Sequence, residues 1–212
     1  MEQMIFKTGT TTLGIVCKEG IILAADKKMT LGGQIVASKK MEKVITLNED
    51  MALTVAGTVS DIQLLVKLIK AQIKLEELKK GKKMKVKEAA NMLGSLVYGN
   101  IRKMSMIPGI TGFLFGGRDT VGTHLFQLGP DGSISEYDDY VTDGSGMMFA
   151  TGVLEAGYTK EISIEEGAKL AIKAISAAME RDTGSGGGID IVTITKDGAK
   201  RIMTKQLESK LV

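Results

Sequence analysis

The 212-residue chain has few aromatic residues, no tryptophan, one histidine and one cysteine. The single cysteine, Cys17, excludes a disulfide within the chain, which is typical of proteins from a reducing compartment, so we expect a cytoplasmic protein. Aromatic residues make up 4% of the chain, and its 28 basic and 25 acidic residues leave a net charge of only +3. These values offer little base stacking or phosphate neutralisation, so no nucleic-acid partner is expected.

Long hydrophobic runs are also missing. The longest, residues 20–25, is far shorter than the roughly 20 residues that a membrane span requires. The first nine residues include Glu2 and lack the stretch of ~7–15 apolar residues found in a secretory signal. We therefore expect a soluble protein with no membrane partner, and a hydrophobic content of 43% suits one globular domain.

Hydrophobic patterning changes period along the chain, from strand-like to helical and back, twice. Strands are expected at residues 10–16, 21–26, 34–37, 43–47, 51–56, 112–115 and 122–128, in a short segment ending at 141, and at 189–195 and 200–203. Helices are expected at residues 60–79, 86–104, 145–155 and 163–181, the last beginning with a capping box of Ser163 and Glu166. Hairpin connections imply antiparallel sheets, and paired helices should cover their outer faces. The order predicts an α+β fold, a four-layer αββα sandwich of two antiparallel sheets flanked by helix pairs.

Several familiar catalytic devices are absent. The only histidine, His124, lies in a strand-like stretch, and no G-x-S-x-G nucleophile elbow accompanies it. No cluster of His, Cys and carboxylate residues has metal-ligand spacing, so neither a metal nor another cofactor is expected. The glycine-rich residues 183–188 fail the dinucleotide spacing because Ile189 stands where the last glycine belongs, and they precede a strand.

Hydroxyl nucleophiles remain, and three consecutive threonines follow Gly9. Threonine is β-branched and suits a strand, so a purely structural reading is available. An α-amine, however, has a reference pKa of roughly 7.7–8.0 against about 10.4 for lysine, so it can accept a proton near neutral pH. Cleavage between Gly9 and Thr10 would therefore place nucleophile and base on one residue, Thr10.

The resemblance to a known family rests on several motifs together. They are GTTTLGI at residues 9–15, AAD followed by two basic residues at 24–28, VAG at 55–57, DGSG at 143–146, GVLE at 152–155, RDTGSGG at 181–187, and Ile189-Asp190. Over nearly its whole length the chain resembles archaeal-type 20S proteasome β-subunits, which are N-terminal-nucleophile (Ntn) hydrolases that cleave their own propeptide before a threonine. The resemblance implies the Ntn-hydrolase fold, with residues 1–9 as an autocleaved propeptide and 10–212 as one catalytic domain. The helical extension that precedes the fold in α-subunits is missing here.

The resemblance also implies a catalytic lysine oriented by Asp26. Lys39, Lys40 and Lys43 compete for this role. Strand alternation places Lys43 on the same face as Ile45. Compared with the usual family spacing, the chain has one extra residue near positions 32–33, and allowing for it also selects Lys43. A buried ammonium beside Thr10 would favour alkoxide character and lower the pKa of the α-amine.

By the same resemblance, the backbone N–H of Gly57 is the expected oxyanion donor. Ser145, Asp182 and Ser185 are expected to support the terminal amine. Met29, Met41 and Val55 match positions that line the pocket for the P1 side chain, and Thr30 matches a backbone contact to extended substrate. Because these three pocket residues are apolar, we expect cleavage after hydrophobic residues.

The expected assembly comes from the resemblance alone. It consists of two stacked heptameric β-rings between rings of α-subunits, with an ATP-driven unfoldase that supplies unfolded proteins. The first two expected helices are candidates for ring contacts. Two other functions stay open: a non-catalytic β-type subunit that builds or regulates a particle, and an N-terminal amidohydrolase that acts on small amides.

Overall fold

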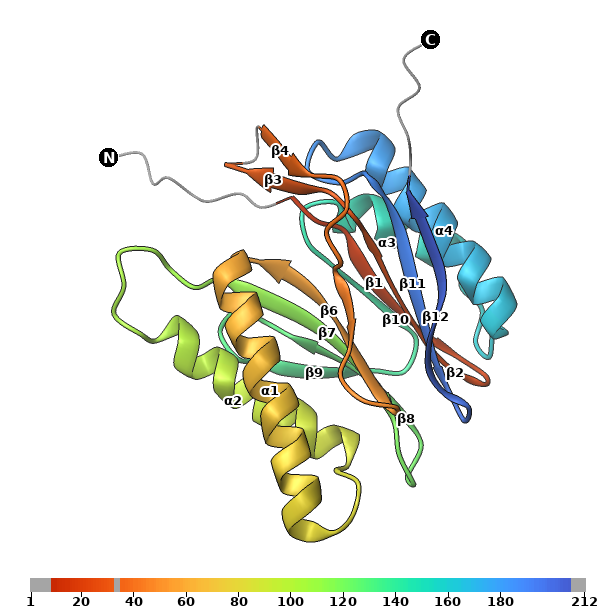
Figure 1. Ribbon diagram of the computed structural model, residues 1–212. Helices are drawn as coiled ribbons and strands as arrows, with labels where there is room; N and C mark the ends of the chain where they lie inside the picture. The colour runs from red at the N-terminus through yellow and green to blue at the C-terminus, as the bar shows by residue number, and fades with distance from the viewer. Residues whose placement is uncertain (1–8, 33–34, 207–212) are drawn as a thin grey trace.

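A computed structural model describes residues 9–32 and 35–206, and Figure 1 shows two sheets packed face to face between two pairs of helices. The first sheet has the strand order β10-β1-β2-β11-β12, and the second has β5-β6-β7-β8-β9. All the pairings within both sheets are antiparallel. The predicted four-layer α+β sandwich is therefore confirmed.

Strand and helix bounds follow the predicted order. The first sheet contains β1 (Thr12–Cys17), β2 (Gly20–Asp26), β10 (Tyr140–Asp143), β11 (Gly188–Thr195) and β12 (Gly198–Gln206). The second contains β5 (Val44–Thr46), β6 (Met51–Gly57), β7 (Thr111–Arg118), β8 (Thr123–Leu128) and β9 (Ile134–Tyr137). A separate hairpin pairs β3 (Met29–Leu31) with β4 (Ile35–Ser38). The helices are α1 (Val59–Lys80), α2 (Val86–Ile101), α3 (Met147–Gly157) and α4 (Ile164–Arg181).

Three buried clusters hold the layers together. One lies between α1, α2 and the second sheet, another between α3, α4 and the first sheet, and a third between the two sheets. Strand β7 serves two of them, because Phe113 and Phe115 face the helices while Leu114 faces the first sheet. Such strands are buried on both faces, which explains their nearly continuous apolar sequence.

Some predicted boundaries were wrong. The segment expected to end at residue 141 is two strands, β9 in one sheet and β10 in the other, so the chain changes sheets between Tyr137 and Tyr140. Strand β3 was not predicted, and the expected strand at 34–37 is β4, of which residue 34 lies outside the described residues. The helix expected to continue to 104 ends at Ile101. The capping box at Ser163 and Glu166 is confirmed, with both of its backbone hydrogen bonds formed.

Two predicted strand starts were wrong near the threonines and the lysine. β1 begins at Thr12 and not at Thr10, because the backbone N–H of Thr11 donates to the Asp26 side chain. β5 begins at Val44, immediately after Lys43. The helix expected from residue 145 begins at Met147, because Gly144, with φ of 95°, turns the chain against the carbonyl oxygen of Thr10.

Strand register brings the site residues to one end of the sandwich. Thr12 pairs with Ala25 on one side and Asp143 on the other, and Ile189 pairs with Asp26. In the second sheet, Gly57 ends β6. Within the described residues, no helix has both the length and the apolar composition needed to cross a membrane.

Candidate active site

The Thr10 side chain lies at the junction with Gly9, at the end of the sandwich where β2 and β6 stop. Thr10 is 4% exposed, and its hydroxyl donates a hydrogen bond to the Gly9 carbonyl oxygen at 2.6 Å. The Lys43 ammonium is 3.0 Å from the Thr10 hydroxyl oxygen and 3.3 Å from the same Gly9 oxygen. One cation therefore contacts both the hydroxyl and the carbonyl of the expected cleavage junction.

The Asp26 carboxylate is fully buried and accepts four hydrogen bonds. Its Oδ1 accepts from the Lys43 ammonium at 2.7 Å and from the Thr11 backbone N–H at 2.9 Å. Its Oδ2 accepts from the backbone N–H groups of Lys28 at 3.0 Å and Gly186 at 2.9 Å. Four donors on one carboxylate compensate the cost of its burial and fix its orientation.

Of the three lysines considered for the role beside Asp26, Lys43 is the one that the structure places there. Lys39 and Lys40 are exposed, whereas Lys43 is 2% exposed. Burial lowers the pKa of Lys43, while the nearby Asp26 carboxylate opposes that shift. The ammonium is thus buried and paired with one carboxylate, at 2.7 Å.

Ser145, Asp182 and Ser185 form a second group on the other side of Thr10. The backbone nitrogen of Thr10 donates to the Ser145 hydroxyl oxygen at 3.1 Å. The hydroxyls of Ser145 and Ser185 both donate to Oδ2 of Asp182, each at 2.6 Å. Ser185 also contacts the Thr11 hydroxyl at 2.6 Å. The nitrogen that cleavage would convert into an amine is therefore linked through Ser145 to a carboxylate.

A small cavity adjoins Thr10. It is lined by the expected pocket residues Met29, Thr30, Met41, Val55 and Gly57, and also by Gly9, Lys28, Lys43, Val59 and Ile62. Its open volume is only about 10 Å³. The Thr30 side chain was not expected to contact the leader, yet its hydroxyl oxygen accepts from the Gly9 backbone nitrogen at 3.1 Å.

Lys28, Val59 and Ile62 were missed as cavity-lining residues. Val59 and Ile62 belong to α1, whose approach to the cavity depends on the packing of the helix layer. Lys28 is one of the two basic residues after Asp26, and its ammonium donates to the Thr183 carbonyl oxygen at 2.6 Å. The two basic residues after Asp26 were part of the family resemblance, but the sequence did not indicate that Lys28 lines the cavity.

Gly57 ends β6 with φ of 120°, a conformation that favours glycine. A Cβ at this position would also overlap the Ile110 carbonyl oxygen. Both observations explain why glycine stands here, in the wall of the Thr10 cavity.

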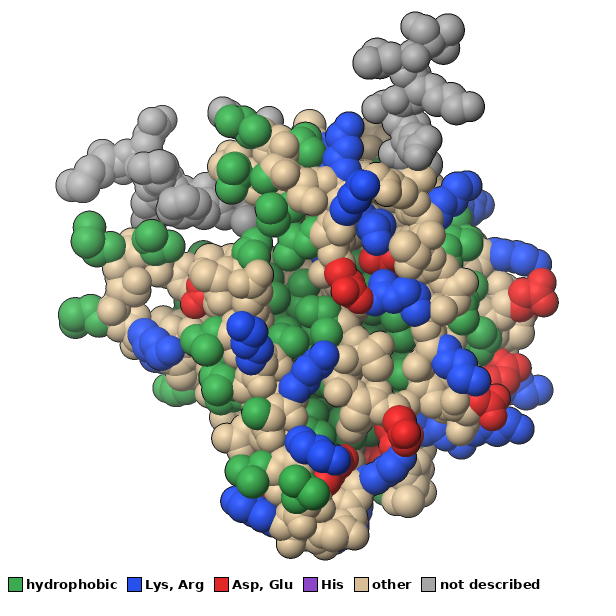
Figure 2. Space-filling view, viewed as in Figure 1, with side chains coloured by type: hydrophobic (Ala, Val, Ile, Leu, Met, Phe, Trp, Pro, Cys, Tyr) green, Lys and Arg blue, Asp and Glu red, His purple; other side chains and the backbone are tan. Residues whose placement is uncertain are grey.

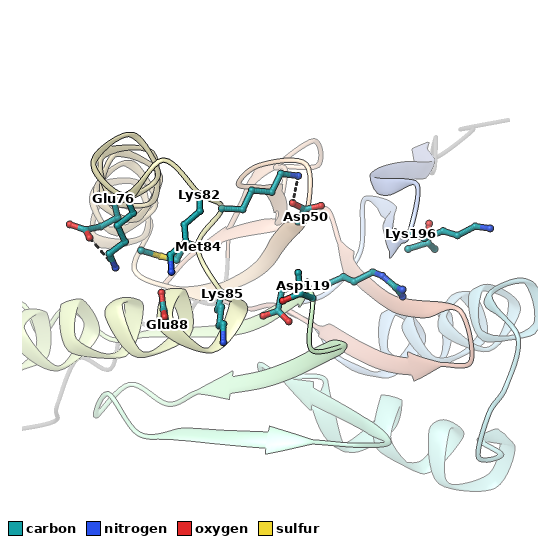
Figure 3. Close-up of a pocket in the computed structure, with 13 residues that line it drawn as sticks. Asp50, Glu76, Lys82, Met84, Lys85, Glu88, Asp119 and Lys196 are labelled. Carbon is teal, nitrogen blue, oxygen red and sulfur yellow. Dashed lines mark hydrogen bonds and ion pairs between the residues drawn. The ribbon is translucent and has the colours of Figure 1, made fainter.

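A larger cavity of about 550 Å³ lies at the opposite end of the strands. Figure 3 shows its charged walls, which come from the α1–α2 connection and from the turns near Asp50, Asp119 and Lys196. Many of these charges already pair with one another, as in Lys83 with Asp50 at 2.5 Å and Lys80 with Glu76 at 3.3 Å. Self-paired charges at the far end from Thr10 make this cavity a poor candidate for the catalytic site.

His124 also lies away from Thr10. It pairs in register with Gly117, near the end of β7 that is opposite to the Gly57 end. Its Nδ1 is 2.8 Å from a carboxylate oxygen of Glu136 on the neighbouring strand. The histidine therefore takes part in a cross-strand pair and not in the group around Thr10.

Comparison with known proteins agrees with this geometry. Residues 6–194 match the family model described as proteasome subunit. The chain belongs to the proteasome subunit family. A protein named proteasome subunit beta from Methanocaldococcus fervens is 40% identical over 204 residues, which cover 96% of this chain and 89% of that protein. The proteasome subunit beta of Archaeoglobus profundus is 38% identical over 211 residues, covering 100% of this chain and 95% of the relative.

A third relative, the proteasome subunit beta of Methanococcus maripaludis, is 37% identical over 207 residues, covering 97% and 92% of the two chains. The resemblance to archaeal-type β-subunits is thus confirmed, and the chain is a proteasome β-type subunit. In this β-type subunit, the family motifs at residues 9–15, 143–146 and 181–187 converge in space around Thr10.

Proposed function

We propose that this β-type subunit is a threonine endopeptidase that activates itself by cleaving the bond between Gly9 and Thr10. The observation that carries the proposal is the position of the Lys43 ammonium, 3.0 Å from the Thr10 hydroxyl and 3.3 Å from the Gly9 carbonyl oxygen. Residues 1–9 are then a propeptide, and residues 10–212 form the mature catalytic domain.

In the self-cleavage step, the Thr10 hydroxyl oxygen attacks the Gly9 carbonyl carbon. The Lys43 ammonium stabilises the negative charge that develops on the carbonyl oxygen. When the peptide C–N bond breaks, the Thr10 nitrogen takes up the proton that the hydroxyl gives up, and Gly9 is left as an ester on the Thr10 oxygen. Water then hydrolyses the ester, which releases Gly9 as a carboxylate and leaves Thr10 with a free amine.

In the peptidase cycle, the freed amine of Thr10 accepts the hydroxyl proton while the hydroxyl oxygen attacks a substrate carbonyl. Ser145, held by Asp182, is placed to orient that amine, and Ser185 supports the same carboxylate. Lys43, fixed by Asp26, lowers the energy of the developing alkoxide. The backbone N–H of Gly57 is the oxyanion donor, and water hydrolyses the acyl-enzyme.

Specificity follows from the cavity beside Thr10. Met29, Met41 and Val55 supply an apolar wall, so side chains of Leu, Phe and Tyr are preferred at the cleavage site. Methionine side chains adapt their shape, so the preference is broad. Lys28 disfavours arginine, although its ammonium is already engaged by the Thr183 carbonyl.

The relatives are named proteasome subunits, and we infer the same assembly for this chain: two stacked heptameric β-rings between α-subunit rings, in the cytoplasm, with unfolded proteins supplied by an ATP-driven unfoldase. Exposed apolar side chains support association with other subunits. Figure 2 shows such side chains over α1 and over the β3–β4 hairpin. They include Leu64, Leu68, Leu75 and Leu78 on α1, and Leu31, Ile35 and Val36 on the hairpin.

The test uses particles assembled with an α-subunit. Thr10→Ala should keep the leader attached and abolish peptidase activity while particles still form, and Thr204→Ala, at an exposed threonine of β12, should behave as wild type. Intact mass measures the leader, and fluorogenic peptides ending in Leu, Phe, Tyr, Arg, Asp or Glu measure activity. Preferential hydrolysis after Arg, Asp or Glu would refute the specificity proposal.

A non-catalytic role is the second candidate, because the cavity beside Thr10 has an open volume of only about 10 Å³. Wild-type subunits that keep the full leader in assembled particles would establish that role. Loss of the first nine residues on assembly would exclude it.

A further inference from the structure

A second buried ion-pair network lies beside the Asp26–Lys43 pair and has no part in the chemistry proposed above. Asp190, on β11, is fully buried. Its two carboxylate oxygens each accept from the Lys27 ammonium at 2.9 Å, and Oδ2 lies 3.2 Å from the guanidinium of Arg201. Arg201 in turn pairs with the Glu42 carboxylate. We call Lys27, Asp190, Arg201 and Glu42 the Asp190 network.

Each end of the Asp190 network adjoins one partner of the Asp26–Lys43 pair. Lys27 follows Asp26 in the chain, and its backbone N–H is bonded to the Gly186 carbonyl at 2.9 Å. At the other end, Arg201 contacts the residues on both sides of Lys43, because its guanidinium donates to the Glu42 carboxylate and to the Val44 carbonyl oxygen at 2.9 Å.

The position of Arg201 depends on an irregularity in β12. The register between β11 and β12 shifts between Ile191 and Val192, so that Val192 faces Arg201 where a regular ladder would place Ile202. A bulge of this kind re-aims side chains. It turns Arg201 toward the inter-sheet face that contains Val192, and it leaves Ile202 49% exposed.

Arg201 therefore joins two sheets at one edge. β12 is the edge strand of the first sheet, and β5 is the edge strand of the second. β5 has only three residues, and Lys43 precedes it, held to β6 by the hydrogen bond from the Val55 N–H to the Lys43 carbonyl at 3.0 Å. A short edge strand has few bonds of its own to fix the lysine that precedes it, and the contacts of Arg201 with Glu42 and Val44 add to that restraint.

We propose that Lys27, Asp190 and Arg201 are positioning residues that hold Lys43 in register with Asp26 and Thr10. The proposal rests on the function proposed above, since it concerns the lysine of that mechanism. The proposed effect is on the position of Lys43; its pKa is lowered chiefly by burial and raised by the Asp26 carboxylate. Displacement by about 1 Å at a reacting centre can cost 10²-fold in rate, so loss of this restraint is measurable.

The experiment compares Arg201→Met with Lys200→Met in particles assembled with an α-subunit. Lys200 is the neighbouring residue on β12 and is exposed, so its replacement removes one positive charge without touching the Asp190 network. Rates are divided by the fraction of subunits with a free Thr10, measured by mass spectrometry. We expect kcat to fall about 10-fold to 100-fold in Arg201→Met with KM within about twofold, and no change in Lys200→Met.

Two further variants keep the test decisive if Arg201→Met fails to fold. Glu42→Ala removes a 61%-exposed carboxylate that pairs with Arg201, and should lower kcat by a smaller factor. Arg201→Lys keeps the charge but cannot reach Asp190, Glu42 and the Val44 carbonyl at once, so it should restore only part of the rate.

In the Glu42→Ala, Arg201→Met double variant the loss of kcat should equal that of Arg201→Met alone.

A second readout does not depend on activity. Acetylation of Lys43, followed by mass spectrometry, should rise several-fold in Arg201→Met, because the ammonium leaves its buried position. Alkylation of Cys17, a buried thiol near the other end of β1, reports general opening of the fold and should stay as in wild type.

If kcat and Lys43 acetylation are both unchanged in Arg201→Met, the proposal is wrong. It is also wrong if Cys17 alkylation rises together with Lys43 acetylation while kcat is unchanged, because the Asp190 network is then purely structural. If wild type and Lys200→Met both lack Thr10-dependent activity, the proposed function fails instead. The acetylation result then still decides whether the Asp190 network positions Lys43.

Discussion

The Lys43 ammonium lies 3.0 Å from the hydroxyl oxygen of Thr10, and both residues are buried. Among residues 9–32 and 35–206, the carboxylate that pairs with it is that of Asp26, at 2.7 Å. Burial of a cation next to a hydroxyl is costly unless the cation is paired, and it strengthens any interaction with negative charge that develops on that oxygen. This arrangement separates two roles of Lys43: it neutralises Asp26, and it faces the proposed nucleophile.

Lys43→Met should remove both roles. Peptide hydrolysis and leader release should fall by at least about 10²–10³-fold, the range found when one donor to a developing oxyanion is deleted. The variant should also lose about 3–5 kcal/mol of stability, because a buried Asp26 charge is left without its cation. Three backbone donors to Asp26 remain, so the loss should be at the lower end of that range.

The double variant Asp26→Asn, Lys43→Met separates stability from catalysis. It contains no buried charge at the pair and should regain most of the stability lost by the single variant, yet stay inactive. Thermal denaturation and peptide hydrolysis measure the two effects. Activity in the double variant close to that of wild type would show that Lys43 does not take part in catalysis.

Gly9 packs so closely on Gly184 that a side chain has no room between them. A Cβ on Gly9 would overlap the Cα atom of Gly184, which is backbone and cannot rotate away. Gly9→Ala should therefore push the junction away from Lys43 and slow leader release by about 10²-fold or more. The control is Gly152→Ala, whose new Cβ meets nothing within 4 Å. Release of the leader at the wild-type rate in Gly9→Ala, followed by mass spectrometry over time, would contradict the geometry.

Ser145 links the Thr10 nitrogen to the Asp182 carboxylate. Ser145→Ala should lower kcat by about 10–100-fold and leave KM nearly unchanged, because the amine loses its orienting partner while the substrate cavity keeps its walls. Asp182→Asn acts on the same link, so the double variant should lose little more than the worse single one. The exposed Ser95→Ala is the matched control. Additive losses would show that the two residues act independently.

Much of the fold was predictable, because the helices α1, α2 and α4 carry apolar stripes at helical spacing and the buried strands are short apolar runs bounded by turns. The failures have local causes. Strand β3 has only three residues, which gives too little alternation to detect. The change of sheet between β9 and β10 depends on which partners the strands find, and no period in residues 134–143 records that. The start of β1 shifted because the Thr11 amide bonds to the side chain of Asp26, at the end of the neighbouring strand β2.

The site was predictable only in part. Chemical elimination led to Thr10, and strand alternation favoured Lys43. The hydrogen bond from the Thr10 nitrogen to Ser145, however, joins residues that are 135 positions apart, and the bond from Ser145 to Asp182 joins residues that are 37 positions apart. No local pattern predicts such contacts, and the family resemblance supplied these residues. Arg201 was not noticed at all, because regular alternation along β12 would point Ile202 inward in its place.

Asp143, the last residue of β10, is half-buried, and its carboxylate lies against Gly112. Burial raises its pKa above the ordinary value of 3.8, although a hydrogen bond from the Gly144 N–H at 2.8 Å opposes the shift. A carboxyl whose pKa is raised in the folded state contributes its full stability below the unfolded pKa, and that contribution is lost as pH rises through the folded pKa. At neutral pH the folded subunit therefore holds a poorly solvated charge.

Asp143→Asn removes this charge and keeps an oxygen that can accept the Gly144 hydrogen bond. The variant should be more stable than wild type at pH 7, by about 1.4 kcal/mol for each unit by which the folded pKa exceeds the unfolded one. The difference should shrink as pH falls through the folded pKa and vanish below 3.8, where the wild-type carboxyl is neutral in both states. Denaturation midpoints from pH 3 to pH 7 measure it, with the exposed Asp197→Asn as the control for the loss of one surface charge. A stabilisation that is equal at both ends of this pH range would mean that the amide packs better than the carboxyl, and that the charge of Asp143 costs the fold nothing.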